Sequence, residues 1–214
     1  VRVNALDVQA SVIAEGANLG LTQLARLEFE SGGGRINSDA IDNSAGVNMS
    51  DYEVNIKILL SSLQQGGNVK TDTERNQILE DATDAVTDLV LQNNVSQHHI
   101  ISMDQVRSKT QPYTIENTIR TLINEGRLSV IDENIPNSKE RDEFYKHQLP
   151  IPRPVLAKCM AYTKLKIKEK IMDPPLFTGN VYHQKFYHYF PVQLQTFLNK
   201  KPRIAHRLKH DIII

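Results

Sequence analysis

The sequence predicts a mainly α-helical protein with a small α/β portion, of one or two strands, before Asn43. Three observations predict this fold class. From Ser50 onward, apolar residues recur mostly at the spacing of a helix. A short apolar run at residues 12–14 stops at a loop that contains Gly16 and Asn18, as a buried strand does. Turn-forming residues then cluster at 42–46, ahead of the first long helix.

The first helix is expected over residues 21–30, where Leu21, Leu24 and Leu27 follow helical spacing and a serine with three glycines ends the pattern. The glycine run could bind a phosphate through its backbone amides. It lacks both the G-x-G-x-x-G spacing of a dinucleotide-binding turn and the G-K-[ST] ending of a P-loop. A flexible turn is the better interpretation.

Two capping patterns predict the next two helix starts. Ser50 with Glu53, and Thr71 with Glu74, each place a carboxylate three residues after a hydroxyl that can cap the first turn. The first of these helices is expected to end at Gly66, and the second at Asn93.

The rest of the chain predicts a succession of helices. Pro112 suits a first turn, Gly126 suits a C-terminal cap, and Pro154 begins a further helix that stops at Asp173. Helical spacing is expected at 100–106, 115–123, 139–147, 154–171, 182–190 and 192–199.

Composition excludes several classes of protein. The chain has 214 residues, 40% of them apolar, which is adequate for a packed core. No apolar run approaches the roughly 20 residues that cross a bilayer, and no secretory leader opens the sequence, so we expect a cytoplasmic protein with no membrane partner. Cys159 is the single cysteine and cannot form an internal disulfide.

The charge pattern argues against a nucleic-acid partner. The 25 basic and 25 acidic residues cancel, although residues 1–138 hold 10 basic against 19 acidic side chains and the remainder holds the opposite excess. Histidines raise the possibility of a metal site, but only His206 and His210 share one helix face, and no third ligand accompanies them. No metal site is expected.

Residues 12–59 carry the strongest functional signal. Two loops of small residues, at 15–18 and 42–47, can each present an amide side chain and close backbone. The helix start predicted at Ser50 follows, and unpaired N–H groups at a helix start favour a carboxylate ligand. The alternative is that these loops are ordinary turns between packed elements.

The same residues carry a family resemblance. Residues 12–26, V-I-A-E-G-A-N-L-G-L-T-Q-L-A-R, and residues 33–59, which include D-N-S-A-G-V-N-M-S, resemble the large bacterial NAD-dependent glutamate dehydrogenase. A looser similarity continues through residues 157–162, 189–191 and 206–208 in the same order.

The resemblance implies roles for four residues. Asn18 and Asn43 would lie beside the nicotinamide and ribose of NAD, while Val47 and Ser50 would line the pocket for L-glutamate. The chemistry is suitable, because asparagine amides both donate and accept hydrogen bonds and a serine hydroxyl can bind a carboxylate. The resemblance implies no catalytic residue within this chain.

The family's substrate-binding lysines, its proton-handling aspartate and its dinucleotide turn lie upstream of the matched blocks. We therefore expect this chain to be part of an enzyme that deaminates L-glutamate to 2-oxoglutarate and ammonia, and to be inactive and unable to bind NAD alone. Its expected partner is the upstream part of the dehydrogenase, or a second copy in a homo-oligomer. The rival hypothesis is a noncatalytic helical fragment or interaction protein, the relic of a truncated dehydrogenase gene.

The resemblance and the composition together suggest three segments. Residues 1–65 would be the C-terminal end of the dehydrogenase catalytic domain, 66–135 a helical segment, and 136–214 a helical C-terminal region. Residues 131–152 are rich in proline, asparagine and charge, which marks the clearest internal boundary.

Overall fold

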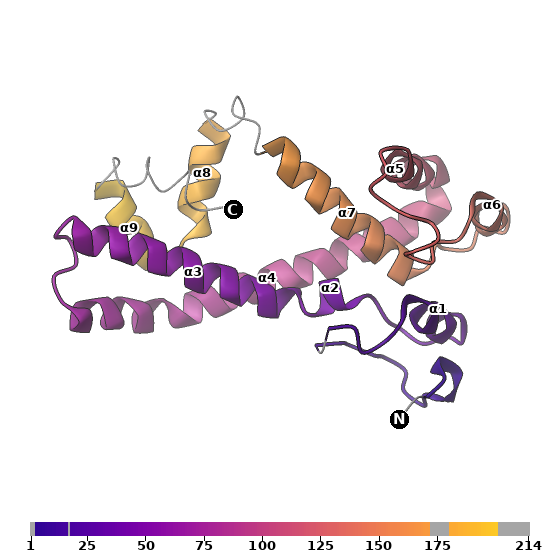
Figure 1. The fold of residues 1–214 in the computed structure, drawn as a ribbon, viewed down its shortest axis with the longest axis horizontal. Helices are drawn as coiled ribbons and strands as arrows, with labels where there is room; N and C mark the ends of the chain where they lie inside the picture. Colours follow the sequence, from indigo (N-terminus) through magenta and orange to yellow (C-terminus); the bar gives the residue numbers. More distant parts are fainter. Residues whose placement is uncertain (1–2, 17, 172–179, 201–214) are drawn as a thin grey trace. The chain divides into compact units, whose positions relative to one another are not determined.

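The computed structural model describes residues 3–16, 18–171 and 180–200, and helices dominate these residues (Figure 1). This confirms the mainly α fold class. The elements in chain order are the 3₁₀ helix η1 (Ala5–Asp7) and the α-helices α1 (Gln23–Ser31), α2 (Asp39–Asp42), α3 (Ser44–Gln65), α4 (Asp72–Thr110), α5 (Pro112–Asn124), α6 (Ser138–Lys146), α7 (Arg153–Ile171), α8 (Asn180–Tyr189) and α9 (Val192–Lys200).

The chain divides into two compact units. The first comprises residues 1–44 and 94–170, and the second comprises residues 45–93 and 171–214. Each unit has buried apolar clusters of its own.

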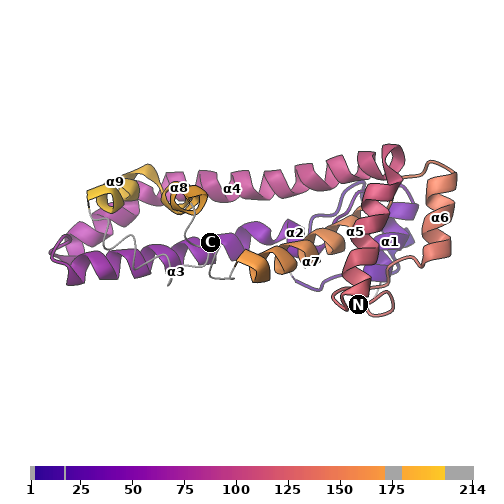
Figure 2. The same cartoon turned by 90° about the horizontal axis from the view of Figure 1, so that it is seen from above.

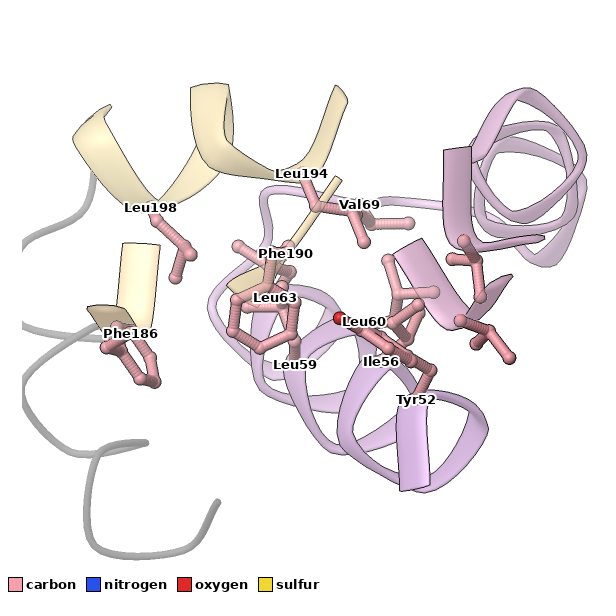
Figure 3. Packing of buried hydrophobic residues seen from close by; sticks show 12 residues of the cluster. Tyr52, Ile56, Leu59, Leu60, Leu63, Val69, Phe186, Phe190, Leu194 and Leu198 are labelled. Carbon is pink, nitrogen blue, oxygen red and sulfur yellow. The ribbon is translucent and has the colours of Figure 1, made fainter. Parts of the chain in front are cut away.

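The core of the second unit lies where α8 and α9 pack beside α3 and the first part of α4 (Figure 2). The stripe Tyr52, Ile56, Leu59 and Leu63 follows helical spacing on α3 and is buried, and Figure 3 shows it facing Phe190 and its neighbours. The rings of Tyr52 and Tyr189 stack with centroids 4.5 Å apart. Apolar and aromatic burial therefore joins segments that are more than a hundred residues apart in sequence.

The first unit has a core built mainly by α5, α7 and the second part of α4. Its fully buried members include Ile101, Ile119, Ile151 and Val155. Ser108 on α4 is also buried, and its Oγ accepts a hydrogen bond of 3.0 Å from the Ile151 amide. This bond satisfies a backbone donor that the core would otherwise leave unpaired.

A third cluster, around Ala5, Phe29 and Ile36, packs the N-terminal segment against α1. Here Val12 and Arg35 form a single parallel bridge. The described residues contain no strand beyond that bridge, so the one or two strands predicted before Asn43 are not shown. Parallel strands are stable when both faces and both neighbours are covered, whereas Val12 is 61% exposed.

Several predicted helix signals are confirmed. Pro112 lies in the first turn of α5, and Gly126 follows its end with φ of 67°, the left-handed conformation that favours glycine. The Thr71 hydroxyl accepts from the Glu74 amide at 3.1 Å, as a capping residue does. The helices expected at 21–30, 139–147, 154–171, 182–190 and 192–199 appear as α1, α6, α7, α8 and α9.

Two predicted helix boundaries are wrong. The helix expected to start at Ser50 begins at Ser44, and the stop expected at Asn93 does not occur, since α4 continues to Thr110. The side chain of Asn94 bears on both errors. Its Nδ2 donates to the Ser44 Oγ at 2.9 Å and to the Ile41 carbonyl at 3.1 Å. An asparagine side chain that makes these hydrogen bonds no longer competes for the backbone hydrogen bonds of its own helix.

Within the described part of the chain, no helix is long and apolar enough to cross a membrane, and no three His, Cys, Asp or Glu side chains gather as metal ligands would. His206 and His210 lie outside the described residues. Cys159 is buried, and burial raises the pKa of its thiol to about 12.

The packing around Gly34 generates the first prediction. A Cβ at this position would overlap the ring of Phe29, which is only 4% exposed. We expect Gly34→Ala to lower the free energy of unfolding by about 1–3 kcal/mol, the usual cost of overpacking. Gly16→Ala is the matched control, because nothing lies within 4 Å of its added methyl group. Urea unfolding followed by circular dichroism measures both, and equal stabilities of the two variants would contradict the prediction.

Candidate functional site

The loop that carries Asn18 is held by a buried ion pair. The carboxylate of Glu15 pairs with the guanidinium of Arg26 on α1, and both side chains are almost completely buried. Glu15 also accepts a hydrogen bond from the Gly20 amide, so its carboxylate closes the loop between them. A Cβ on Gly20 would lie 2.9 Å from that carboxylate, so a larger residue there would require the Glu15 side chain to shift.

Asp39 holds the same loop from a second side. Its Oδ2 accepts from the Leu19 amide at 3.0 Å, and Arg26 lies 3.7 Å from its Oδ1. Burial alone would raise the pKa of Asp39, but the hydrogen bonds from Leu19 and Ala40 and the charge of Arg26 lower it below its usual value. The carboxyl is therefore ionised at neutral pH and available as an acceptor.

The backbone at the loop tip is held in a sparsely populated conformation. Asn18 and Leu19 have φ of 38° and 62°, in the left-handed region. Asparagine tolerates that region better than most residues, whereas leucine does not. Leu19 is also 84% exposed, so no burial of its side chain compensates. Strain of this kind persists where surrounding contacts over-determine it, and such positions are frequent at functional sites.

The structure brings Asn18 and Asn43 together. The Asn43 Nδ2 donates to the Asn18 Oδ1 at 2.8 Å, although the residues are 25 apart in sequence. Each asparagine amide has one acceptor oxygen and two donor hydrogens. The bond leaves the Asn18 nitrogen, the Asn43 oxygen and the second hydrogen of the Asn43 nitrogen to meet a ligand, so the pair offers both donors and an acceptor.

The Asp42 carboxylate joins the two loops. Its side chain is 3% exposed and accepts from the Glu15 amide at 3.1 Å and from the Asn37 Nδ2 at 3.0 Å. The His98 Nε2 lies 3.1 Å from it, and the other ring nitrogen lies 2.8 Å from the Asn94 carbonyl. The carboxylate therefore contacts residues from three separate parts of the chain.

Val47 and Ser50 belong to the second unit and lie within α3. They are three residues apart, so they share one face of the helix, and both are exposed, Val47 by 59%. Ser50 lies inside the helix and not at its start, so the expected helix-terminus attraction for a carboxylate does not apply to it. Its hydroxyl can still donate to a ligand from an exposed helix face.

The sequence alone did not single out the residues that support the loops: Glu15, Arg26, Asn37, Asp39, Asp42 and His98. A signal was available for five of them, because they fall inside the two blocks that carry the family resemblance. His98 had no such signal, because its contact with Asp42 depends on how α4 packs.

Two family models match the chain. Residues 1–104 match the catalytic domain of bacterial NAD-glutamate dehydrogenase, and residues 148–214 match the C-terminal domain of glutamate dehydrogenase. The first match contains all four candidate site residues.

Relatives that align with the whole of this chain carry the name NAD-specific glutamate dehydrogenase. Over 213 residues the chain is 40% identical to the NAD-specific glutamate dehydrogenase of Mycobacterium tuberculosis, 36% to that of Pseudomonas aeruginosa and 32% to that of Halomonas elongata. Each alignment covers 100% of this chain but 13% of the relative. No solved structure matches the chain.

The buried ion pair generates the second prediction. Arg26→Met leaves the Glu15 carboxylate buried without its partner, which should lower the free energy of unfolding by about 3–5 kcal/mol. Lys57→Met is the control, because Lys57 and Glu53 form an ion pair in which both side chains are more than half exposed. An unchanged midpoint of chemical denaturation for Arg26→Met would show that the ion pair does not hold the loop.

Proposed function

Because this chain belongs to the bacterial NAD-glutamate dehydrogenase family, we propose that it forms part of the active site of an NAD-dependent glutamate dehydrogenase. The reaction is the oxidative deamination of L-glutamate to 2-oxoglutarate and ammonia, with a hydride transferred to NAD. The chain spans 13% of the length of its relatives, and the proposed reaction needs residues outside it.

The hydrogen-bonded pair of Asn18 and Asn43 is the observation that carries the proposal. Together the two side chains offer a donor and an acceptor, which match the oxygen and nitrogen of a nicotinamide carboxamide and the hydroxyls of its ribose. The strained left-handed backbone at Asn18 supports the same role, because the surrounding loop holds this side chain in place before a ligand binds.

Val47 and Ser50 are proposed to contact L-glutamate. The hydroxyl of Ser50 can donate to a carboxylate, and Val47 can pack against the aliphatic part of the substrate. Their exposure supports the proposal, because a residue that lines a binding surface stays accessible when no ligand covers it.

We propose that the upstream part of the dehydrogenase completes the N-terminal segment. In that assembly the segments of Val12 and Arg35, joined by one parallel bridge, become strands of a larger parallel sheet. The exposed side chains of Val12 and Leu19 support this, since both are apolar and more than half exposed. Homo-oligomerisation and a cytoplasmic location stay predictions of the sequence.

A titration of the isolated chain with NADH gives the third prediction. We expect no saturable binding at micromolar concentrations, because a few hydrogen bonds to nicotinamide and ribose cannot offset the loss of translational and rotational freedom. The measurement is NADH fluorescence. The alternative of a noncatalytic interaction protein predicts the same result, so a separate test must discriminate the two.

The discriminating test is a chimera in which this chain replaces the matched segment of the Mycobacterium tuberculosis relative. We expect the chimera to reduce NAD with L-glutamate as substrate. Asn43→Ala should raise the KM for NAD about 5- to 30-fold, as the loss of one or two hydrogen bonds does. Ser50→Ala should raise the KM for L-glutamate instead. Asn124→Ala, at the exposed end of α5, is the control.

A folded chimera that lacks activity would favour the noncatalytic alternative. An active chimera in which Asn43→Ala leaves the KM for NAD unchanged would remove the asparagine pair from the cofactor site.

A further inference from the structure

Arg153 is the first residue of α7, and its polar contacts reach three segments far away in sequence. Its backbone amide donates to the Glu30 Oε1 at 3.1 Å, its Nε donates to the Asn37 Oδ1 at 2.9 Å, and its Nη1 donates to the Ser102 Oγ at 3.0 Å. Arg153 lies in the stretch that matches the C-terminal domain, whereas all three partners lie in the stretch that matches the catalytic domain. It therefore links the two matched regions within the first unit.

The contact with Arg153 fixes which way the Asn37 amide points. A guanidinium has only donors, so it can accept nothing from an asparagine nitrogen. The Asn37 oxygen must therefore face Arg153, which turns the nitrogen towards Asp42, where it donates to the Oδ1 at 3.0 Å. Asn37 is 8% exposed, so water has little access to replace either bond.

The Asp42 carboxylate passes this constraint to both loops of the candidate site. Its Oδ2 accepts from the amide of Glu15, three residues before Asn18. Asp42 is also the residue directly before Asn43, whose side chain donates to Asn18. If the Asn37 amide reversed, its oxygen would face the carboxylate and both groups would be acceptors, so Asp42 would lose a donor and gain a repulsive neighbour.

We propose that Arg153 is a positioning residue for the asparagine pair, and that it acts through Asn37 and Asp42 to hold the loops of Asn18 and Asn43 in register. Its effect on catalysis rests on the proposed function, because it needs the asparagine pair to bind NAD. Arg153 itself touches neither Asn18 nor Asn43.

The fourth prediction is measured by hydrogen exchange in the isolated chain. Arg153→Gln should speed exchange of the Glu15 amide, which is bonded to Asp42, about 5- to 30-fold. The Leu19 amide is the internal reference, because it is bonded to Asp39, outside the path from Arg153. Its exchange should change much less. Equal acceleration of both amides would mean that the substitution merely loosens the whole loop, and this result would overturn the proposal.

Two further variants test the orientation of Asn37 and exclude general destabilisation. Arg153→Lys replaces the guanidinium by an ammonium, which also has only donors, so we expect it to protect the Glu15 amide better than Arg153→Gln does. Equal acceleration of exchange in the two variants would contradict a role through the orientation of Asn37. Arg141→Lys is the matched control, because Arg141 is a buried arginine of the same unit that binds Glu116. It should leave both amides unchanged.

In the active chimera, Arg153→Gln should raise the KM for NAD about 5- to 30-fold and leave the KM for L-glutamate unchanged. Combining it with Asn37→Ala should add little to either single effect, because residues in one path are not additive. Full additivity of the two effects would contradict an action of Arg153 through Asn37. If Asn43→Ala leaves the KM for NAD unchanged, the proposed function fails, and exchange of the Glu15 amide still decides whether Arg153 positions the loops.

Discussion

The candidate site depends on one buried carboxylate, that of Asp42, and on its need for hydrogen-bond donors. Three donors from three parts of the chain, the Glu15 amide, the Asn37 side chain and the His98 ring, converge on it. A buried carboxylate without such partners would be costly, so their positions are coupled. This coupling places the loop of Asn18 beside Asn43, the residue that follows Asp42 in the chain.

A second buried carboxylate shapes the loop itself. Glu15 pairs with Arg26 and accepts from the Gly20 amide, which brings the two ends of the loop together around Asn18 and Leu19. The left-handed backbone at the tip is then a consequence of closure over few residues. Polar burial in the first unit thus positions amide side chains before any ligand is present, which lowers the entropic cost of binding one.

The sequence was informative where a signal is local. Pro112, Gly126 and the Thr71 cap each predict a helix end, and the structure has them there, because such signals act within one turn. Local signals failed at Ser50 and Asn93, close to a tertiary contact between Asn94 and Ser44 that no local pattern indicates. The strands predicted before Asn43 could not be judged from the sequence, because a parallel strand depends on neighbours distant in the chain. For the same reason Arg153 gave no signal, since its partners lie 51 to 123 residues away.

The proposed role of the asparagine pair is to face the nicotinamide end of NAD. An experimental structure of the chimera with NAD bound would decide whether it does. We expect the Asn18 nitrogen and the Asn43 oxygen each to lie about 3 Å from a polar atom of the nicotinamide or its ribose. A structure with NAD bound elsewhere, and with the two asparagines bonded only to each other, would contradict it.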